Sequence, residues 1–163
     1  MNFHQYVPLQ KDINQDNWRG VDEFIKENPG AENAKISYSE DKALHTAIFA
    51  GSMNIVKELV KPMPGDRLNE LDAENYTFLG YCALIGNIEM AKCIIEMNQD
   101  GKDGLSIGNG PKNIIPVVVA LTYCPEIKMV EYLYSVTPLE QLSPENGSNG
   151  ATFITRAIYA KAF

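Results

Sequence analysis

The chain has 163 residues, 45% of them hydrophobic and 21% charged, and its 21 acidic against 14 basic side chains give a formal net charge of −7. This composition excludes a disordered chain, because so apolar a sequence can bury a core. It also argues against a protein that mainly grips nucleic acid, which needs clustered Lys and Arg. At this length one domain, spanning residues 1–163, is the default.

The sequence shows no targeting signal and no membrane span. The residues before Tyr6 have neither the basic nor the apolar region of a secretion signal. The longest apolar run, residues 114–121, covers eight positions, against the ~20 that cross a bilayer. The chain has three cysteines, Cys82, Cys93 and Cys124, and none is spaced as C-x-x-C. This odd number and spacing predict neither a disulfide framework nor a zinc site, and they fit a reducing compartment. We expect a cytoplasmic protein.

The sequence repeats itself with a period near 35 residues. Residues 41–60 contain Leu44, Ala47 and Gly51, followed by the apolar pairs Ile55-Val56 and Leu59-Val60. A shift of 35 residues places these positions again on small or apolar residues, namely Leu79, Cys82, Gly86, Met90-Ala91 and Ile94-Ile95. A shift back by 35 places Leu44 on Leu9 and Leu59-Val60 on Phe24-Ile25. A period of this length is typical of stacked repeats.

Further copies follow towards the C-terminus. A fourth begins at residues 115–120 and closes at residues 129–134, with one residue inserted near Cys124. A fifth opens at residues 149–157 and is cut off at Phe163. We place the repeats at about 6–35, 36–70, 71–108 and 109–144, with a partial copy over 145–163.

Each copy combines a turn, a short helix and a second helix. Turn-forming residues come first, at 37–41, 72–76, 108–113 and 145–150. The first helix ends at a glycine such as Gly51 or Gly86, and the second carries apolar pairs at i, i+1, i+4 and i+5. Because helices this short are not stable alone, the pattern predicts an all-α solenoid of stacked helix-turn-helix units, about four repeats plus a truncated fifth.

The run Lys42-Ala-Leu-His-Thr-Ala47, with Gly51 and the later apolar pairs, resembles the ankyrin repeat, whose core reads T-P-L-H-x-A. The copies are degenerate, since Lys42 and Ile115 replace the motif threonine and Gly80 and Val118 replace the motif histidine. The resemblance implies that the remaining histidine, His45, is structural and hydrogen-bonds to loop backbone.

Four segments are more narrowly similar to plant ankyrin proteins of the accelerated-cell-death type: residues 6–9, 42–47, 115–120 and 132–139. That family usually ends in a multi-span membrane domain, the PGG domain, and is implicated in defence, cell death and stress signalling. This chain resembles only the ankyrin part. The resemblance implies a place in the cytoplasm, or at the cytosolic face of a membrane in a longer form.

Two motifs suggest a bound ion but have simpler interpretations. Residues 12–23 match the calcium-loop pattern D-x-[DN]-x-[DN]-G-x5-E except at the sixth position, which is Asn17. Arg19 occupies the eighth position, and the segment also aligns with the first repeat's turn. The glycines between residues 101 and 110 lack the strand and the GxxxxGK[ST] pattern of a phosphate loop, and they predict a long mobile loop. We therefore expect no metal and no cofactor.

No catalytic constellation is visible. His45 has no nucleophile or orienting acid evident in the sequence, so we expect a protein without enzymatic activity. Cys82 takes the small alanine position of its helix and Cys93 lies beside Ile94-Ile95, which predicts buried structural thiols. Cys124, at the glycine turn position, should be the most exposed of the three.

In the ankyrin architecture, partners bind the turns and the exposed positions of the first helices, which together form the concave face. Here those positions are rich in aromatic and apolar residues, which mark a binding patch when exposed. The candidate partner-binding residues are Tyr38, Asp41, Phe49, Glu74, Tyr76, Leu84, Ile85, Lys112, Ile114 and Tyr123. We expect Tyr38, Tyr76 and Tyr123 to form a ladder along this face.

The pattern leaves the kind of ligand open. The main interpretation is a non-catalytic module that binds another protein, and the alternative is a sensor that holds a small apolar or peptide ligand in the concave groove. At the C-terminal end, the fifth copy offers Ile154, Ile158, Tyr159 and Phe163 without a second helix to cover them. We expect these residues to fold back, fray or mediate self-association.

Overall fold

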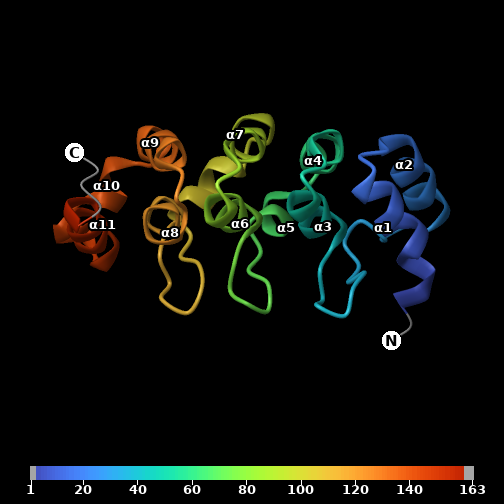
Figure 1. The fold of residues 1–163 in the computed structure, drawn as a ribbon, viewed down its shortest axis with the longest axis horizontal. Coiled ribbons are helices and arrows are strands. Elements are labelled where there is room, and N and C mark those ends of the chain that lie inside the picture. The colour runs from blue at the N-terminus through green and yellow to red at the C-terminus, as the bar shows by residue number, and fades with distance from the viewer. Residues whose placement is uncertain (1–2, 160–163) are drawn as a thin grey trace. The chain divides into compact units, whose positions relative to one another are not determined.

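The computed structural model describes residues 3–159, except for the side chain of Asn146, and its regular elements are helices (Figure 1). In chain order they are η1 (Phe3–Tyr6), α1 (Val7–Asn14), α2 (Trp18–Glu27), α3 (Ala43–Ala50), α4 (Met53–Val60), α5 (Gly65–Leu68), α6 (Phe78–Ile85), α7 (Ile88–Met97), η2 (Gly101–Ser106), α8 (Pro116–Tyr123), α9 (Ile127–Val136), α10 (Leu139–Leu142), η3 (Pro144–Asn146) and α11 (Ser148–Tyr159). Among the described residues, no helix is long and apolar enough to span a membrane.

The chain divides into two compact units, one ending at Met63 and one starting at Pro64. In the first unit α1 packs against α2 and α3, and α4 packs against α3 and α2. Its core consists of apolar side chains spaced as the repeat predicts, with Leu9, Ile13, Val21, Leu44, Ile48, Ile55, Val56 and Val60 almost fully buried. The expectation of one domain over residues 1–163 stays a prediction.

The second unit repeats the same pairing. Helix α6 packs against α7 and α8, α8 packs against α9 and α11, and α7 contacts α9 and η2. The core again follows the predicted apolar positions, with Leu79, Cys82, Met90, Ala91, Ile94, Val118, Met129 and Leu133 buried. Burial of one helix pair against the next provides the stability that each short helix lacks.

Glycine ends the first helix of two copies, as the sequence predicts. Gly51 after α3 and Gly86 after α6 adopt φ angles of 75° and 78°, a left-handed conformation that glycine adopts without strain. Cys124 stands at this position after α8 and has a φ of −93°, so α8 ends in extended backbone instead. A Cβ atom on Gly86 would lie 2.8 Å from the Cys124 Sγ, which adds a packing requirement for glycine there.

Two connecting segments differ from the expectations. The glycine-rich stretch predicted as a mobile loop contains the 3-10 helix η2, in which Gly101, Gly104 and Leu105 are buried. Gly101 lies so close to α7 that a Cβ atom would overlap the carbonyl oxygen of Ile94. The turn predicted at residues 145–150 is also wrong in part, because η3 occupies its start and α11 already begins at Ser148.

Candidate functional site

Three hairpin-like loops precede the first helices and carry most of the predicted site residues. Backbone hydrogen bonds close them: Ile36 N–H donates to the Asp41 carbonyl at 2.7 Å, Asp72 N–H to Tyr76 at 3.0 Å, and Asn109 N–H to Ile114 at 2.7 Å. The tip residues Glu40, Asn75 and Asn113 have φ angles of 64°, 60° and 51°, a left-handed conformation that asparagine tolerates better than most residues. These hairpins are therefore well defined local structures.

The start of each first helix is capped differently. In α3 the Nδ1 of His45 accepts a hydrogen bond from Lys42 N–H at 3.0 Å, and His45 is buried. This is the backbone-bonding role predicted for His45. In α6 the hydroxyl of Thr77 accepts from Gly80 N–H at 3.0 Å, which is an ordinary N-cap.

The next hairpin completes the cap of α6. The side-chain oxygen of Asn109 accepts from the backbone N–H of Thr77 at 2.8 Å and from its hydroxyl at 3.0 Å. Gly80 stands where the motif has its histidine. A Cβ atom on Gly80 would lie 2.0 Å from the Asn109 side-chain oxygen, so Asn109 occupies the space that a side chain at this position would need. One repeat further on, the Asn149 side-chain oxygen accepts from Ile115 N–H at 3.1 Å.

Tyr76 and Tyr81 of the second unit lie together, and we call these two residues and Tyr123, at the end of the neighbouring helix α8, the tyrosine cluster. The rings of Tyr76 and Tyr81 are 5.1 Å apart between centroids and tilted by 32°. A Cβ atom on Gly110 would lie 2.7 Å from the Tyr76 hydroxyl, so the following hairpin supports that ring. Gly110 N–H also donates to the Asn75 carbonyl at 2.6 Å, which joins the two hairpins.

Asp72 organises the cluster from its base. Its Oδ1 accepts from the backbone N–H groups of Glu74 at 3.0 Å and Tyr76 at 2.9 Å, and its Oδ2 accepts from the Tyr81 hydroxyl at 2.6 Å. Burial, followed by interactions with Tyr123 and Asp72, raises the pKa of the Tyr76 hydroxyl above its ordinary value. The Tyr76 phenol therefore stays protonated to a higher pH than a free tyrosine side chain does.

The other predicted residues of the second unit differ in exposure. Glu74, Ile85, Lys112 and Tyr123 are exposed, and Leu84 is half-buried. Ile85 and Tyr123 occupy the last positions of α6 and α8, and α6 and α8 pack against each other. The expectation that Ile114 is exposed is wrong. Its backbone pairs with Asn109 and its side chain is 7% exposed, because the strand of the hairpin after Asn113 turns into the core.

The predicted site residues of the first unit are Tyr38, Asp41 and Phe49, and each has different surroundings. Tyr38 is 85% exposed, and its ring contacts Phe3 edge-on at 4.8 Å between centroids. The Asp41 carboxylate accepts from the Ser37 hydroxyl at 2.8 Å, and Phe49 is half exposed. The expected ladder of Tyr38, Tyr76 and Tyr123 stays a prediction.

Tyr81 is the site residue that the sequence analysis missed. It falls at the position marked x in T-P-L-H-x-A, where Thr46 stands in the preceding copy. That position is variable in the motif because its side chain is not required for the core of its own repeat. The sequence signal that could have identified Tyr81 is an aromatic residue at this variable position, nine residues after Asp72.

The calcium-like segment has a structural role. Asp16, with a φ of 51°, accepts through its carboxylate from Asn54 N–H at 3.3 Å and Ile55 N–H at 3.1 Å, and thereby caps α4. Asn17 caps α2 by accepting from Gly20 N–H at 3.4 Å. Within residues 3–159 no group of three or more His, Cys, Asp or Glu side chains is placed to hold a metal ion.

The cysteines lie as predicted. Cys82 and Cys93 are buried, whereas Cys124 is partly exposed, and all three are free thiols. Burial is the largest cause that raises the pKa of the Cys82 thiol above its ordinary range, and Cys93 adds to it. A thiol held protonated in this way is a poor nucleophile.

The family model for ankyrin repeats in three copies matches residues 13–104, more than half of the chain. The chain belongs to the ankyrin-repeat family. The stacked helix pairs and the hairpins that precede them agree with this membership. A search of curated proteins found no match.

Membership in this family settles the coarse functional class. Ankyrin repeats are generally non-catalytic and act as protein–protein interaction modules. Partners of this chain are therefore expected to be other proteins.

Proposed function

We propose that the chain is a binding module whose partner docks on the hairpins and first helices, with the tyrosine cluster as its anchor. In the second unit the proposed contact residues are the cluster together with Glu74, Leu84, Ile85 and Lys112. In the first unit Tyr38, Asp41 and Phe49 are proposed as a contact surface of their own. A single observation carries the proposal. The rings of Tyr76 and Tyr81 pack together beside the hairpins, in the unit where Ile85 and Tyr123, at the ends of the packed helices α6 and α8, are 44% and 45% exposed.

Tyrosine is well suited to such an anchor. It offers a large rigid area and a polar tip, and its immobilisation costs little conformational entropy. The ring of Tyr76 is already held by Gly110 and Tyr81 before any partner arrives. A site held in its binding conformation loses less entropy on association than a mobile one does.

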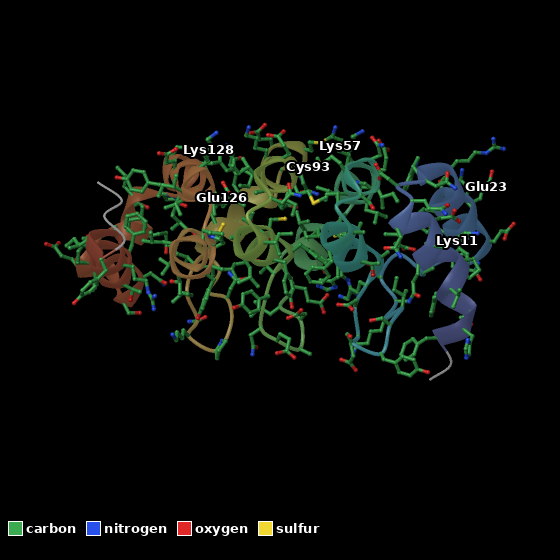
Figure 2. All side chains as sticks on the ribbon, viewed as in Figure 1. Lys11, Glu23, Lys57, Cys93, Glu126 and Lys128 are labelled. Atoms are coloured by element: carbon green, nitrogen blue, oxygen red, sulfur yellow. The ribbon has the colours of Figure 1, made fainter. Side chains whose placement is uncertain are left out.

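The proposal is tested by affinity capture with paired variants. The full chain and the variants Tyr76→Ala, Tyr123→Ala and Lys128→Ala are used as baits, and the captured proteins are quantified. Lys128 is exposed on α9, on the side away from the hairpins (Figure 2). We expect a specific partner that is retained by Lys128→Ala and reduced by both tyrosine variants, with a loss of about 2 kcal/mol or more for a central anchor. Partners captured equally by all four folded baits would contradict the proposal.

The resemblance to plant ankyrin proteins of the accelerated-cell-death type supports a narrower proposal. It assigns the module to cytoplasmic defence or stress signalling, on the basis of the four similar segments. The family match concerns ankyrin repeats as such, so the plant subgroup stays a prediction. Identification of the captured partner as a signalling component would test it, and a partner of another class would contradict it.

A second contact, between copies of this chain, is supported by the C-terminal surface. An apolar pocket of about 80 Å³ lies between α8, α9 and α11, lined by Leu121, Ile127, Val130, Glu131, Tyr134, Phe153 and Ala157. Tyr134 stacks on Phe153 at 5.5 Å between ring centroids, and Ile154, Ile158 and Tyr159 of α11 are exposed. Phe163, included in the sequence prediction, lies outside the described residues.

Sedimentation at increasing concentration tests this contact. We expect the apparent mass to rise with concentration, and the double variant Ile154→Ser/Ile158→Ser to stay monomeric at the same concentration. Lys128→Ala should behave like the parent chain. A parent chain that remains monomeric at high concentration would rule out self-association through this surface.

A further inference from the structure

The tyrosine cluster lies in an acidic part of the surface. Asp72 contacts Tyr81 directly, and Glu74, two residues further along the same hairpin, is exposed. The chain as a whole carries a formal net charge of −7. A group that docks beside these tyrosines therefore meets the Asp72 carboxylate at close range, which favours a cation.

The rings themselves attract a cation. The face of an aromatic ring carries negative charge density, and tyrosine faces bind guanidinium or ammonium groups within about 6 Å. Tyr76 and Tyr81 are inclined by 32° with centroids 5.1 Å apart, and neither side chain is fully buried. Tyr123 offers a third ring, exposed at the last position of α8, the helix that packs against α6.

We propose that the tyrosine cluster, with the carboxylates of Asp72 and Glu74, forms a docking site for an arginine side chain of the partner protein. This inference rests on the proposed function and specifies the chemistry that the site recognises. Arginine fits better than lysine because its planar, weakly hydrated guanidinium stacks on aromatic faces. Its fork of N–H donors also matches a carboxylate such as that of Glu74.

The hydrogen bonds within the site leave it ready for such a ligand. Asp72 Oδ1 already accepts two backbone N–H groups, and Oδ2 accepts the Tyr81 hydroxyl, so Asp72 holds the rings and contributes its charge. Burial and the charges around it raise the pKa of the Tyr76 hydroxyl. Of these causes, the Asp72 carboxylate is the one that also favours a bound cation, whereas burial disfavours any charge.

Lys112 opposes this attraction. It is exposed near the tip of the hairpin that contains Gly110, which contacts the Tyr76 ring. Its positive charge lowers the local affinity for a cation, and this repulsion weakens with distance and with added salt. Removing this charge should therefore strengthen arginine binding, a direction that no general destabilisation of the site would produce.

Three short capped peptides test the inference against the full chain. They share the sequence Gly-Ser-X-Ser-Gly, in which X is arginine, lysine or citrulline, the neutral isostere of arginine. Binding is followed by NMR titration of the tyrosine ring signals, assigned with single Tyr→Phe variants. We expect saturable shifts of Tyr76, Tyr81 and Tyr123 with the arginine peptide, and dissociation constants about 3–10-fold larger with citrulline.

Matched variants locate the site. Tyr76→Leu should abolish the preference for arginine over citrulline. Asp72→Asn, which keeps the side-chain oxygen that the turn requires, and Glu74→Gln should each weaken arginine binding about 2–5-fold. Lys112→Gln should strengthen it, and Lys128→Gln should leave it unchanged. Unaltered backbone spectra show that each variant is folded.

Equal binding of the arginine and citrulline peptides would overturn the inference, as would tighter binding of the lysine peptide or shifts confined to other tyrosines. These outcomes are separable from the fate of the proposed function. If partner capture depends on Tyr76 while the peptides do not discriminate, the arginine site is wrong and the binding module stands. If the peptides discriminate while partner capture ignores the cluster, the arginine site stands and the proposed function is wrong.

Discussion

The starts of α3 and α6 occupy equivalent places in consecutive repeats, yet different groups hold them. At α3 the cap is local, because His45 accepts the N–H of Lys42 three residues earlier. At α6 the cap is shared, because Asn109 reaches from the next hairpin to the N–H and hydroxyl of Thr77. Loss of the motif histidine at Gly80 is therefore accompanied by a side chain supplied from another repeat.

The same contrast extends to the hairpin tyrosines. Tyr38 is largely exposed and contacts Phe3 of its own unit. Tyr76 is half-buried against Tyr81 and the backbone of Gly110. The place of Tyr76 thus depends on the hairpin of the following repeat, and this residue is also the candidate anchor.

The largest expected effects concern two core leucines that occupy equivalent positions in α3 and α6. Leu44 in α3 and Leu79 in α6 are 0% and 1% exposed, so Leu44→Ala and Leu79→Ala should each lower the free energy of unfolding by about 2–5 kcal/mol. Denaturant unfolding measures both. Similar losses would show that the cores of the two repeats are equivalent. A loss below 1 kcal/mol for either variant would contradict the equivalence of their cores.

A smaller effect is expected from the caps, and here the two repeats should differ. Asn109→Ala leaves the buried Thr77 N–H and hydroxyl without their acceptor, which should cost about 1–3 kcal/mol of unfolding free energy. His45→Ala removes a local cap and should cost about 1 kcal/mol. Asn33→Ala, at an exposed position, is the control and should change little.

A double-mutant cycle isolates the shared cap. Gly80→Ala should destabilise the parent chain, because the added methyl group meets the Asn109 side chain. In the Asn109→Ala background that space is vacant, and alanine's higher helix propensity, by about 1 kcal/mol, should make the same change neutral or stabilising. Additive effects in the cycle would contradict direct contact between these two positions.

Sequence periodicity predicts the core positions of the two repeats but not the cap that Asn109 supplies to α6. Leu44, Leu79 and the apolar pairs of α4 and α7 could be placed in the core, since helical spacing reports burial within a repeat. The hydrogen bonds that Thr77 donates to Asn109 could not be predicted, because they depend on how far one repeat is displaced along the next. The 3-10 helix η2 was missed for another reason: its glycines are typical of a loop, whereas Gly101 is required by the close approach of the α7 backbone.

The candidate site was likewise only partly predictable. Tyr76 and Tyr123 were identified from their positions at a turn and a helix end, whereas Tyr81 was overlooked because it lies inside α6. Ile114 was placed on the surface, although the hairpin directs its side chain into the core. Sequence position identifies the hairpins, but the direction of a side chain after a left-handed tip residue is fixed only by the folded loop.

The smallest expected effect tests the environment of Tyr76 through the pH dependence of stability. The pKa of its phenol is raised in the folded chain, chiefly by burial and further by Tyr123 and Asp72, whereas the unfolded value is about 10. Below pH 10 both states bind the proton and Tyr76 contributes no pH dependence. As the pH rises above 10, the unfolded chain releases the proton first, so the free energy of unfolding falls until the folded pKa is passed.

Denaturant unfolding at pH 9, 10 and 11 should therefore show a steeper decline for the parent chain than for Tyr76→Phe, which lacks the titrating group. Ile85→Val changes the same surface without removing a titrating group, and its stability curve should run parallel to that of the parent. Tyr132, whose pKa burial and Glu96 raise to about 12, should contribute a decline of the same sign between pH 10 and 12. If Tyr76→Phe declined as steeply as the parent, Tyr76 would lie in a more open environment, and the two hairpin tyrosines would be alike after all.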